Sequence, residues 1–226
     1  MKLIDLKRNP GLLCEGLGWI FAKSAGVRVP KFATIVMVPL NRIRPSVSLP
    51  SWLDDYSEYP AWCVEAVDGK SVAEISKWIL WLRRRQCLSS KDTSTLASFD
   101  IWADNRDRNF GNVIRTKKGE YIAIDHETLL HDLVVQGMYD IKYEERSLLK
   151  EAKKHMQPTN FQQFQHEVVS AAHKHGPALQ SAIQAAERYV STITANSADD
   201  LWQSIYDYLY QRAQAGWMSN FMGMII

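Results

Sequence analysis

The stretch from Phe99 to Leu130 constrains this chain of 226 residues more than any other, because it places polar side chains between two short apolar runs. Asn105 and Asp107 stand in the first polar loop, and Asn112 follows the aspartate by five positions. The second apolar run ends directly in Asp125. Carboxylate and amide oxygens at such spacing are able to share one metal ion or one substrate.

A β-hairpin is predicted between Asn112 and Asp125. Its strands are the apolar couplet Val113-Ile114 and the run Tyr121–Ile124, and Lys117-Lys118-Gly119 supplies turn residues between them. The hairpin would return the carboxylate of Asp125 to the edge at which the loop ends. An ordinary polar hairpin remains the alternative, since turns favour Asn and Asp in any protein.

The spacing matches the chemistry of phosphoryl transfer, which needs one carboxylate near the acceptor hydroxyl and two oxygen ligands for magnesium. The catalytic loop of protein kinases reads H-R-D-x-x-x-x-N, and a metal-binding Asp follows on the next strand. Here Asn105 takes the place of the His, and Asp125-His126-Glu127 takes the place of Asp-Phe-Gly. The pattern therefore predicts Asp107 as the catalytic residue and Asn112 and Asp125 as metal ligands.

Two segments resemble the HipA-like kinases, which are relatives of the protein kinase and phosphatidylinositol kinase folds. The first is Trp102–Asn112 followed by Ile124-Asp125-His126, and the second is a helix that starts near Glu15 and ends before Pro30. The resemblance covers the chain from about Leu12 to His131. It implies an α+β, kinase-like fold with ATP and Mg2+ as cofactors, a protein hydroxyl as acceptor, and a toxin–antitoxin or defence setting.

The resemblance also implies roles in a small N-terminal lobe. Glu15 would pair with a strand lysine that anchors the phosphates, and either Lys7 or Lys2 could be that lysine unless both are solvated. The segment Ala61–Val67 would be the strand leading to the hinge between lobes, with Glu65 and Val67 near the adenine. Arg108 would support the phosphates or the catalytic loop.

A complete family member carries a glycine-rich loop that covers the phosphates, whereas no Gly-x-Gly-x-x-Gly pattern occurs among the fourteen residues before Glu15. Three explanations stay open: a trimmed kinase without that loop, a separate protein that completes the N-terminal lobe, or a catalytically impaired scaffold. Transfer of a nucleotidyl group is a further alternative, because the same metal ligands serve both reactions. We expect a reduced lobe at residues 1–68 and a helical lobe at 69–226.

Composition excludes several classes of protein. The formal net charge is only +2, which gives no general case for binding nucleic acid or an anionic membrane. The three cysteines have no C-x-x-C spacing and predict buried thiols of a reducing compartment. No apolar run approaches the length of a membrane span, and no signal layout opens the chain. We therefore expect a cytoplasmic protein.

The remaining sequence predicts a buried strand at Phe32–Val38 and a loop-rich segment from Asn41 to Pro60. A helix is predicted from Ser71 to Arg85, with its last arginines complementing the helix dipole rather than binding phosphate. Further helices are predicted at Thr93–Trp102, Tyr143–His155, Asn160–His175, Pro177–Thr194 and Ala198–Met218. The four histidines from His155 to His175 are interpreted as solvated helix residues rather than a metal site.

Overall fold

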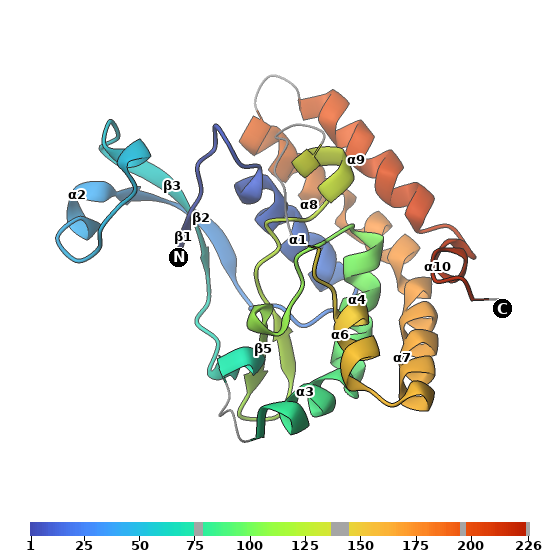
Figure 1. Cartoon of the computed structure of the whole chain (residues 1–226). Helices are drawn as coiled ribbons and strands as arrows, with labels where there is room; N and C mark the ends of the chain where they lie inside the picture. Colours follow the sequence, from blue (N-terminus) through green and yellow to red (C-terminus); the bar gives the residue numbers. More distant parts are fainter. Residues whose placement is uncertain (75–78, 137–144, 195–197, 225–226) are drawn as a thin grey trace.

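The structure, a computed structural model, describes residues 1–74, 79–136, 145–194 and 198–224. Within these ranges the chain has an α+β fold with two three-stranded antiparallel sheets (Figure 1). The strands are β1 (Lys2–Leu3), β2 (Ala33–Pro39), β3 (Glu58–Val64), β4 (Gly69–Ser71), β5 (Val113–Thr116) and β6 (Tyr121–Ala123).

The helices are α1 (Gly11–Ser24), α2 (Leu40–Ile43), α3 (Leu80–Leu88), α4 (Lys91–Trp102), α6 (Leu148–His155), α7 (Pro158–Ala171), α8 (His175–Thr194), α9 (Ala198–Arg212) and α10 (Trp217–Phe221). Short 3-10 turns are η1 (Ser51–Leu53), η2 (Val72–Glu74), η4 (Phe110–Asn112) and η6 (Ala172–Lys174), and a π turn is η5 (His131–Val135). None of the helices found in the described ranges has the length and apolarity needed to cross a membrane.

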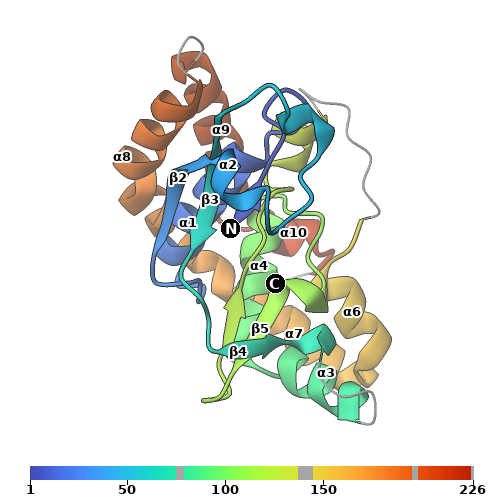
Figure 2. The ribbon, with the colours of Figure 1, turned by 90° about the vertical axis from the view of Figure 1, so that its left-hand side faces the viewer.

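The first sheet has the strand order β1-β3-β2 and lies at one side of the molecule, away from the large group of helices (Figures 1 and 2). Lys2 of β1 and Ile35 of β2 both pair with Trp62 of the central strand β3. Trp62 is buried with Ile4 and Leu12, so the start of α1 packs against one face of the sheet. This packing places the N-terminal strand beside the first turn of α1.

The prediction of a buried strand at Phe32–Val38 is wrong in its burial. The strand β2 forms at Ala33–Pro39, but Phe32, Val36 and Met37 are exposed. β2 is an edge strand, and the consecutive residues Val36 and Met37, whose side chains point to opposite faces of the sheet, both meet solvent.

Helix α1 belongs to the same hydrophobic core as the C-terminal helices, although the sequence placed it in the small lobe. Its buried side chains share a cluster with those of α4, α7 and α8. A Cβ at Gly16 would lie 2.0 Å from the ring of Tyr189 on α8, so glycine allows the two helices to approach closely. The Tyr189 hydroxyl donates to the carbonyl of Leu12 at 2.6 Å and fixes this crossing. Because α1 is held rigidly, Glu15 has a defined position.

The second sheet has the order β4-β5-β6 and contains the predicted hairpin. Gly119 has a φ of +85° in its turn, a conformation that glycine adopts without strain. The helix predicted from Ser71 is wrong at its start, because Ser71 ends β4 and α3 begins at Leu80. Residues 75–78 of that prediction lie outside the described residues. The hydroxyl of Ser71 donates to the Phe110 carbonyl, which favours the strand.

The predicted helix at Thr93–Trp102 is confirmed as α4, whose N-cap is Ser90. The prediction that His175 is solvated is wrong. It is 2% exposed and stacks on the indole of Trp102 at a centroid distance of 4.7 Å. Its Nε2 lies 3.3 Å from the hydroxyl of Ser98. The helical period of α8 directs this ring inward, where Trp102 offers a flat apolar surface.

We predict that His175 makes the protein less stable in mild acid. Burial lowers the pKa of His175 from 6.5 to about 3, so between these values the unfolded chain binds a proton that the folded chain does not. From this residue alone, stability should therefore fall by about 1 kcal/mol between pH 6.5 and 5.5, and the slope should approach about 1.4 kcal/mol per pH unit at lower pH. Urea unfolding at pH 6.5 and 5.5 should show a smaller loss for His175→Phe, which keeps a ring on Trp102.

The same substitution at His166 on α7, an exposed histidine, serves as the control. It should leave the pH dependence of the wild type unchanged. Equal slopes for the wild type and His175→Phe would show that His175 does not cause the effect.

Candidate functional site

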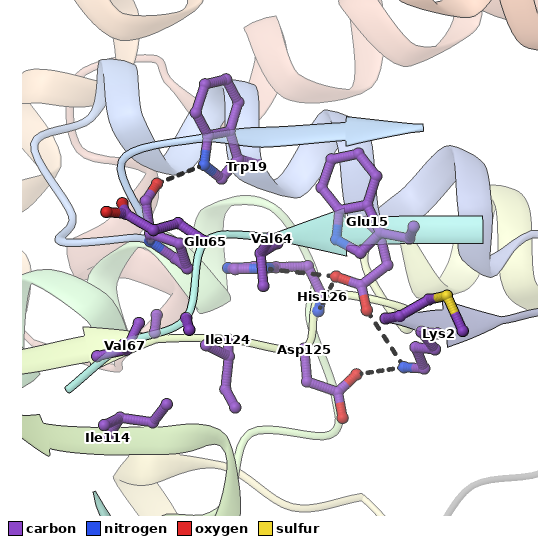
Figure 3. Close-up of a pocket in the computed structure, with 15 residues that line it drawn as sticks. Lys2, Glu15, Trp19, Val64, Glu65, Val67, Ile114, Ile124, Asp125 and His126 are labelled. Carbon is purple, nitrogen blue, oxygen red and sulfur yellow. Dashed lines mark hydrogen bonds and ion pairs between the residues drawn. The ribbon is translucent and has the colours of Figure 1, made fainter. Parts of the chain in front are cut away.

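A cleft of about 480 Å³ lies between the first sheet, helix α1 and the hairpin β5–β6. One end is charged and carries Lys2, Glu15 and Asp125, and the other end is apolar and is lined by Val67, Ile114 and Ile124 (Figure 3). A ligand with an anionic part and a flat apolar part would match this division.

Lys2 is the centre of the charged end. Its ammonium lies 3.2 Å from Glu15 Oε1 and 2.8 Å from Asp125 Oδ1 (Figure 3). It also lies 2.6 Å from Glu127 Oε2. Burial alone would lower the pKa of Lys2, but Glu15 and Asp125 raise it above its ordinary value, so the side chain stays charged. Three carboxylates around one ammonium leave this end of the cleft with an excess of negative charge.

Glu15 lies in the first half of α1, where the sequence predicted it, and is 3% exposed. Its Oε2 accepts a hydrogen bond of 2.9 Å from the backbone N–H of His126, and its Oε1 meets Lys2. Burial raises the pKa of Glu15, while the charge of Lys2 and the His126 N–H lower it. Glu15 therefore connects the strand lysine to the segment that carries Asp125.

Asp125 follows β6 with a φ of +64°, a left-handed conformation that is uncommon for a residue with a side chain. The neighbouring backbone is held on both sides, since Ile124 N–H bonds the Asn112 carbonyl and His126 N–H bonds Glu15. Strained residues of this kind persist where the surroundings fix them, and they cluster at functional sites. The turn directs the Asp125 carboxylate into the cleft (Figure 3).

Asn112 ends η4 at the start of strand β5. Its side-chain amide donates to the Asp107 carbonyl at 2.9 Å, which fixes the rotamer. Among the described residues no donor meets its Oδ1. With Ile124 bonded to the Asn112 backbone, the structure brings Asn112 and Asp125 together as the sequence predicted.

Asp107 lies in the loop after α4, with 15% of its side chain exposed. Both of its carboxylate oxygens are engaged by Arg146, at 2.6 Å from Nε and 2.8 Å from Nη2. The backbone of Arg146 also joins the loop, because its N–H bonds the Arg106 carbonyl and its carbonyl accepts from Arg108 N–H. No sequence pattern indicates a role for Arg146, which comes from a segment far along the chain.

Arg108 was predicted to support either the phosphates or the loop, and its contacts in the structure match the second role. Its side chain is 0% exposed and forms a two-bond ion pair with Asp100, at 3.0 Å from Nε and 3.1 Å from Nη2. Its Nη1 reaches the carbonyls of Asn112, Ile124 and Asp125. Arg108 therefore holds the loop after α4 against the two ends of the hairpin. Its side chain does not line the cleft.

Lys7 and Lys2 were the two candidates for the strand lysine. Lys2 is the one that lines the cleft, and Lys7 does not. Lys7 is exposed in the turn after β1, and its N–H bonds the side chain of Asp5. Alternation along a two-residue strand is too short to tell the two lysines apart. Pairing with Trp62 of β3 is what selects Lys2.

Glu65 and Val67 both line the cleft beyond the end of β3. The Glu65 N–H bonds the Phe32 carbonyl, and its carboxylate accepts from the Lys31 N–H. Within the described residues, the Glu65 carbonyl and the Val67 N–H form no hydrogen bond. A backbone acceptor and a donor are thus available at the apolar end of the cleft, where the sequence placed the hinge.

A second group of polar side chains, Asp104, His131 and Asp132, has ligand atoms within 4.8 Å of one another. Arg106 forms ion pairs with both of its carboxylates. The Tyr208 hydroxyl also donates to Asp104, so the group ties the loop to α9. We interpret it as structural.

No model of a known protein family matches the chain, and a search of curated proteins likewise finds no match.

We predict that Arg108→Met lowers the free energy of unfolding by about 3–5 kcal/mol, because it leaves Asp100 charged and unpaired in the interior. Urea denaturation measures the change. In Asp100→Leu/Arg108→Met no unpaired charge stays buried, so part of the loss should be recovered. Arg8→Met, at an arginine whose side chain is 86% exposed, is the control and should change stability by less than about 0.5 kcal/mol. A loss below 1 kcal/mol in Arg108→Met would contradict this role.

Proposed function

We propose that the protein is a kinase-like phosphotransferase that uses ATP and Mg2+ to phosphorylate a protein hydroxyl. The observation that carries the proposal is the link from Lys2 to Glu15 and Asp125 at the charged end of the cleft. A strand lysine paired with a helix glutamate, beside a metal-binding aspartate, is the arrangement that protein kinases require for activity. The strand order and the position of α1 after β1 support the same kinase-like fold.

The two ends of the cleft suggest how a nucleotide binds. The Glu65 carbonyl and Val67 N–H would pair with the edge of adenine, and Ile114 and Ile124 would pack on the ring. At the other end, the ammonium of Lys2 would contact the phosphates, and Glu15 would hold it in place. Trp19 is itself fixed by a hydrogen bond of 2.8 Å to the Pro30 carbonyl and closes one side of the cleft.

The donor set fits magnesium. Asp125, Asn112 and Glu127 offer oxygen atoms, which Mg2+ prefers. Asp125 lines the cleft itself, and the imidazole of His126 lies beside it. Asp125 and Asn112 would hold the ion, and a bound ion would neutralise charge on the phosphates. The excess of carboxylates over ammonium groups at this end is itself an argument for a cation, because like charges packed together raise the energy of the site.

Asp107 would orient and deprotonate the acceptor hydroxyl. Its carboxylate must first be released by Arg146, since both oxygens are engaged. The same observation favours a second candidate function, a catalytically impaired kinase-like scaffold that binds nucleotide without transferring phosphate. The two candidates share the nucleotide site and differ in whether Asp107 is accessible to an acceptor.

We predict that Asp125→Asn removes magnesium-dependent nucleotide binding while the fold is retained. The substitution keeps the shape of the side chain but removes the charge that would hold the cation. Calorimetry with a non-hydrolysable ATP analogue, with and without magnesium, measures the effect. Asp5→Asn, at a carboxylate outside the cleft, is the control and should bind as the wild type does. Unchanged affinity in Asp125→Asn would refute the metal assignment.

We predict that Asp107→Ala abolishes phosphate transfer with a much smaller effect on nucleotide affinity, because a catalytic base that contacts only the acceptor acts mainly in the transition state. Incorporation of radiolabelled phosphate, including autophosphorylation, is the assay. Asp54→Ala, at an exposed carboxylate far from the cleft, is the control. Comparable incorporation by Asp107→Ala and the wild type would mean that Asp107 is structural. Nucleotide binding by a wild type that transfers no phosphate would favour the scaffold.

A further inference from the structure

A second hollow, of about 310 Å³, lies between β4, β5 and α3, apart from the cleft described above. Four cationic side chains line it, namely Lys70, Arg83, Arg115 and Lys117, and Asp68 is the one carboxylate among its lining residues in the described ranges. This local excess of three positive charges exceeds the formal net charge of the whole chain, which is +2. Cationic side chains are thus concentrated here rather than spread over the surface.

Two of these cations are forced together by the sheet. Lys70 of β4 pairs directly with Arg115 of β5, so both side chains lie on the same face. Like charges directly opposite in an antiparallel pair destabilise a sheet. Arg83 approaches the same place from α3, although its Nη1 also donates to Gln86. A protein keeps such a cluster at a cost in stability, and a bound anion would offset that cost.

The hydrogen-bonding state of Arg115 points to the same conclusion. Its Nε is buried, and it meets no acceptor among the described residues. A buried N–H without a partner is unfavourable. Tyr121 pairs directly with Arg115 across the sheet: burial raises the pKa of its phenol, while a hydrogen bond from Arg115 and the charges of Arg115 and Arg83 lower it. One buried donor of Arg115 thus lacks an acceptor, although another donor of the same side chain bonds Tyr121.

Lys117 lies at the edge of the hollow, where its ion pair with Asp68 can open. Its ammonium lies 2.8 Å from Asp68, but both side chains are more than 75% exposed, so the pair is weak and opens easily. Thr116 adds a hydroxyl at the same edge. Guanidinium and ammonium groups around a small hollow bind phosphate through charge-assisted hydrogen bonds, and arginine does so with two bonds at once.

We propose that this hollow is a binding site for a phosphate group, held by Lys70, Arg83 and Arg115. The site is independent of the proposed phosphoryl transfer, because it lies on the β4 side of the sheet and shares no lining residue with the charged end of the cleft. The phosphate has two sources with the same chemistry, a soluble phosphorylated compound and a phospholipid headgroup. Exposed Ile79 lines the hollow directly before α3, and exposed Trp81 and Leu82 follow in the first turn of α3; these side chains would contact lipid in the second case.

The test uses the purified full chain and two probes without magnesium: inorganic pyrophosphate in calorimetry, and vesicles of phosphatidylcholine with or without phosphatidylinositol phosphate in co-sedimentation. We expect binding in at least one arm, weakened by added salt. In Lys70→Gln/Arg115→Gln it should be about tenfold weaker. Without magnesium the cleft should not bind pyrophosphate, because three carboxylates surround Lys2 and repel an anion.

Arg8→Gln/Arg42→Gln removes the same charge from exposed positions elsewhere and should bind as the wild type does. Lys70→Gln alone, at an exposed side chain, covers the case in which the double variant fails to fold, and it should also weaken binding. Binding to pyrophosphate alone assigns the site to a soluble ligand, and binding to the phosphoinositide vesicles alone assigns it to a headgroup. No binding in either arm, or equal loss in the control, overturns the proposal.

Discussion

The buried pair of Arg108 and Asp100 is the interaction on which the candidate site depends. Asp100 lies on α4, and Arg108 lies in the loop that follows it, so the pair closes this loop upon its own helix. The remaining donors of Arg108 reach the carbonyls of Asn112 and Asp125, which belong to the two ends of the hairpin. One guanidinium therefore sets the relative positions of both proposed metal ligands. Lysine could not replace it, because a single ammonium lacks the several donors arranged in one plane.

The second organising interaction is the contact of Lys2 with Glu15, Asp125 and Glu127, which joins three distant parts of the chain. The sheet fixes the lysine, α1 fixes Glu15, and the strained turn after β6 fixes Asp125. The fixed position of Glu15 depends in turn on the close approach of α1 to α8 at Gly16. The large helical core therefore helps to fix the position of Glu15 in the site. None of the C-terminal helices lines the cleft among its described residues.

Local patterns predicted those parts of the structure that depend on neighbouring residues. The hairpin and the helix before the loop that carries Asp107 follow from periodicity and turn residues. The helix that carries Glu15 was expected from the family resemblance. The sequence also placed Asp107, Asn112 and Asp125 correctly relative to these elements. For Arg108 the sequence left support of the phosphates and support of the loop both open, and only the position of Asp100 shows that the side chain is internal. Local sequence patterns do not predict the contacts of Arg146 with Asp107 or of His175 with Trp102, because only tertiary packing brings these residues together.

The contact of Arg146 with Asp107 bears directly on the choice between enzyme and scaffold. Two backbone hydrogen bonds hold the Arg146 segment against the loop, so release of the side chain need not displace the segment. The guanidinium is 47% exposed, and water competes for its donors. Asp107, with 15% of its side chain exposed, is the more buried partner of the pair. In the proposed reaction an acceptor hydroxyl would have to displace the Arg146 guanidinium from Asp107, while the backbone hydrogen bonds of the same segment would still hold the loop. The proposed role of Asp107 therefore requires a movement of the Arg146 side chain and no rearrangement of the backbone.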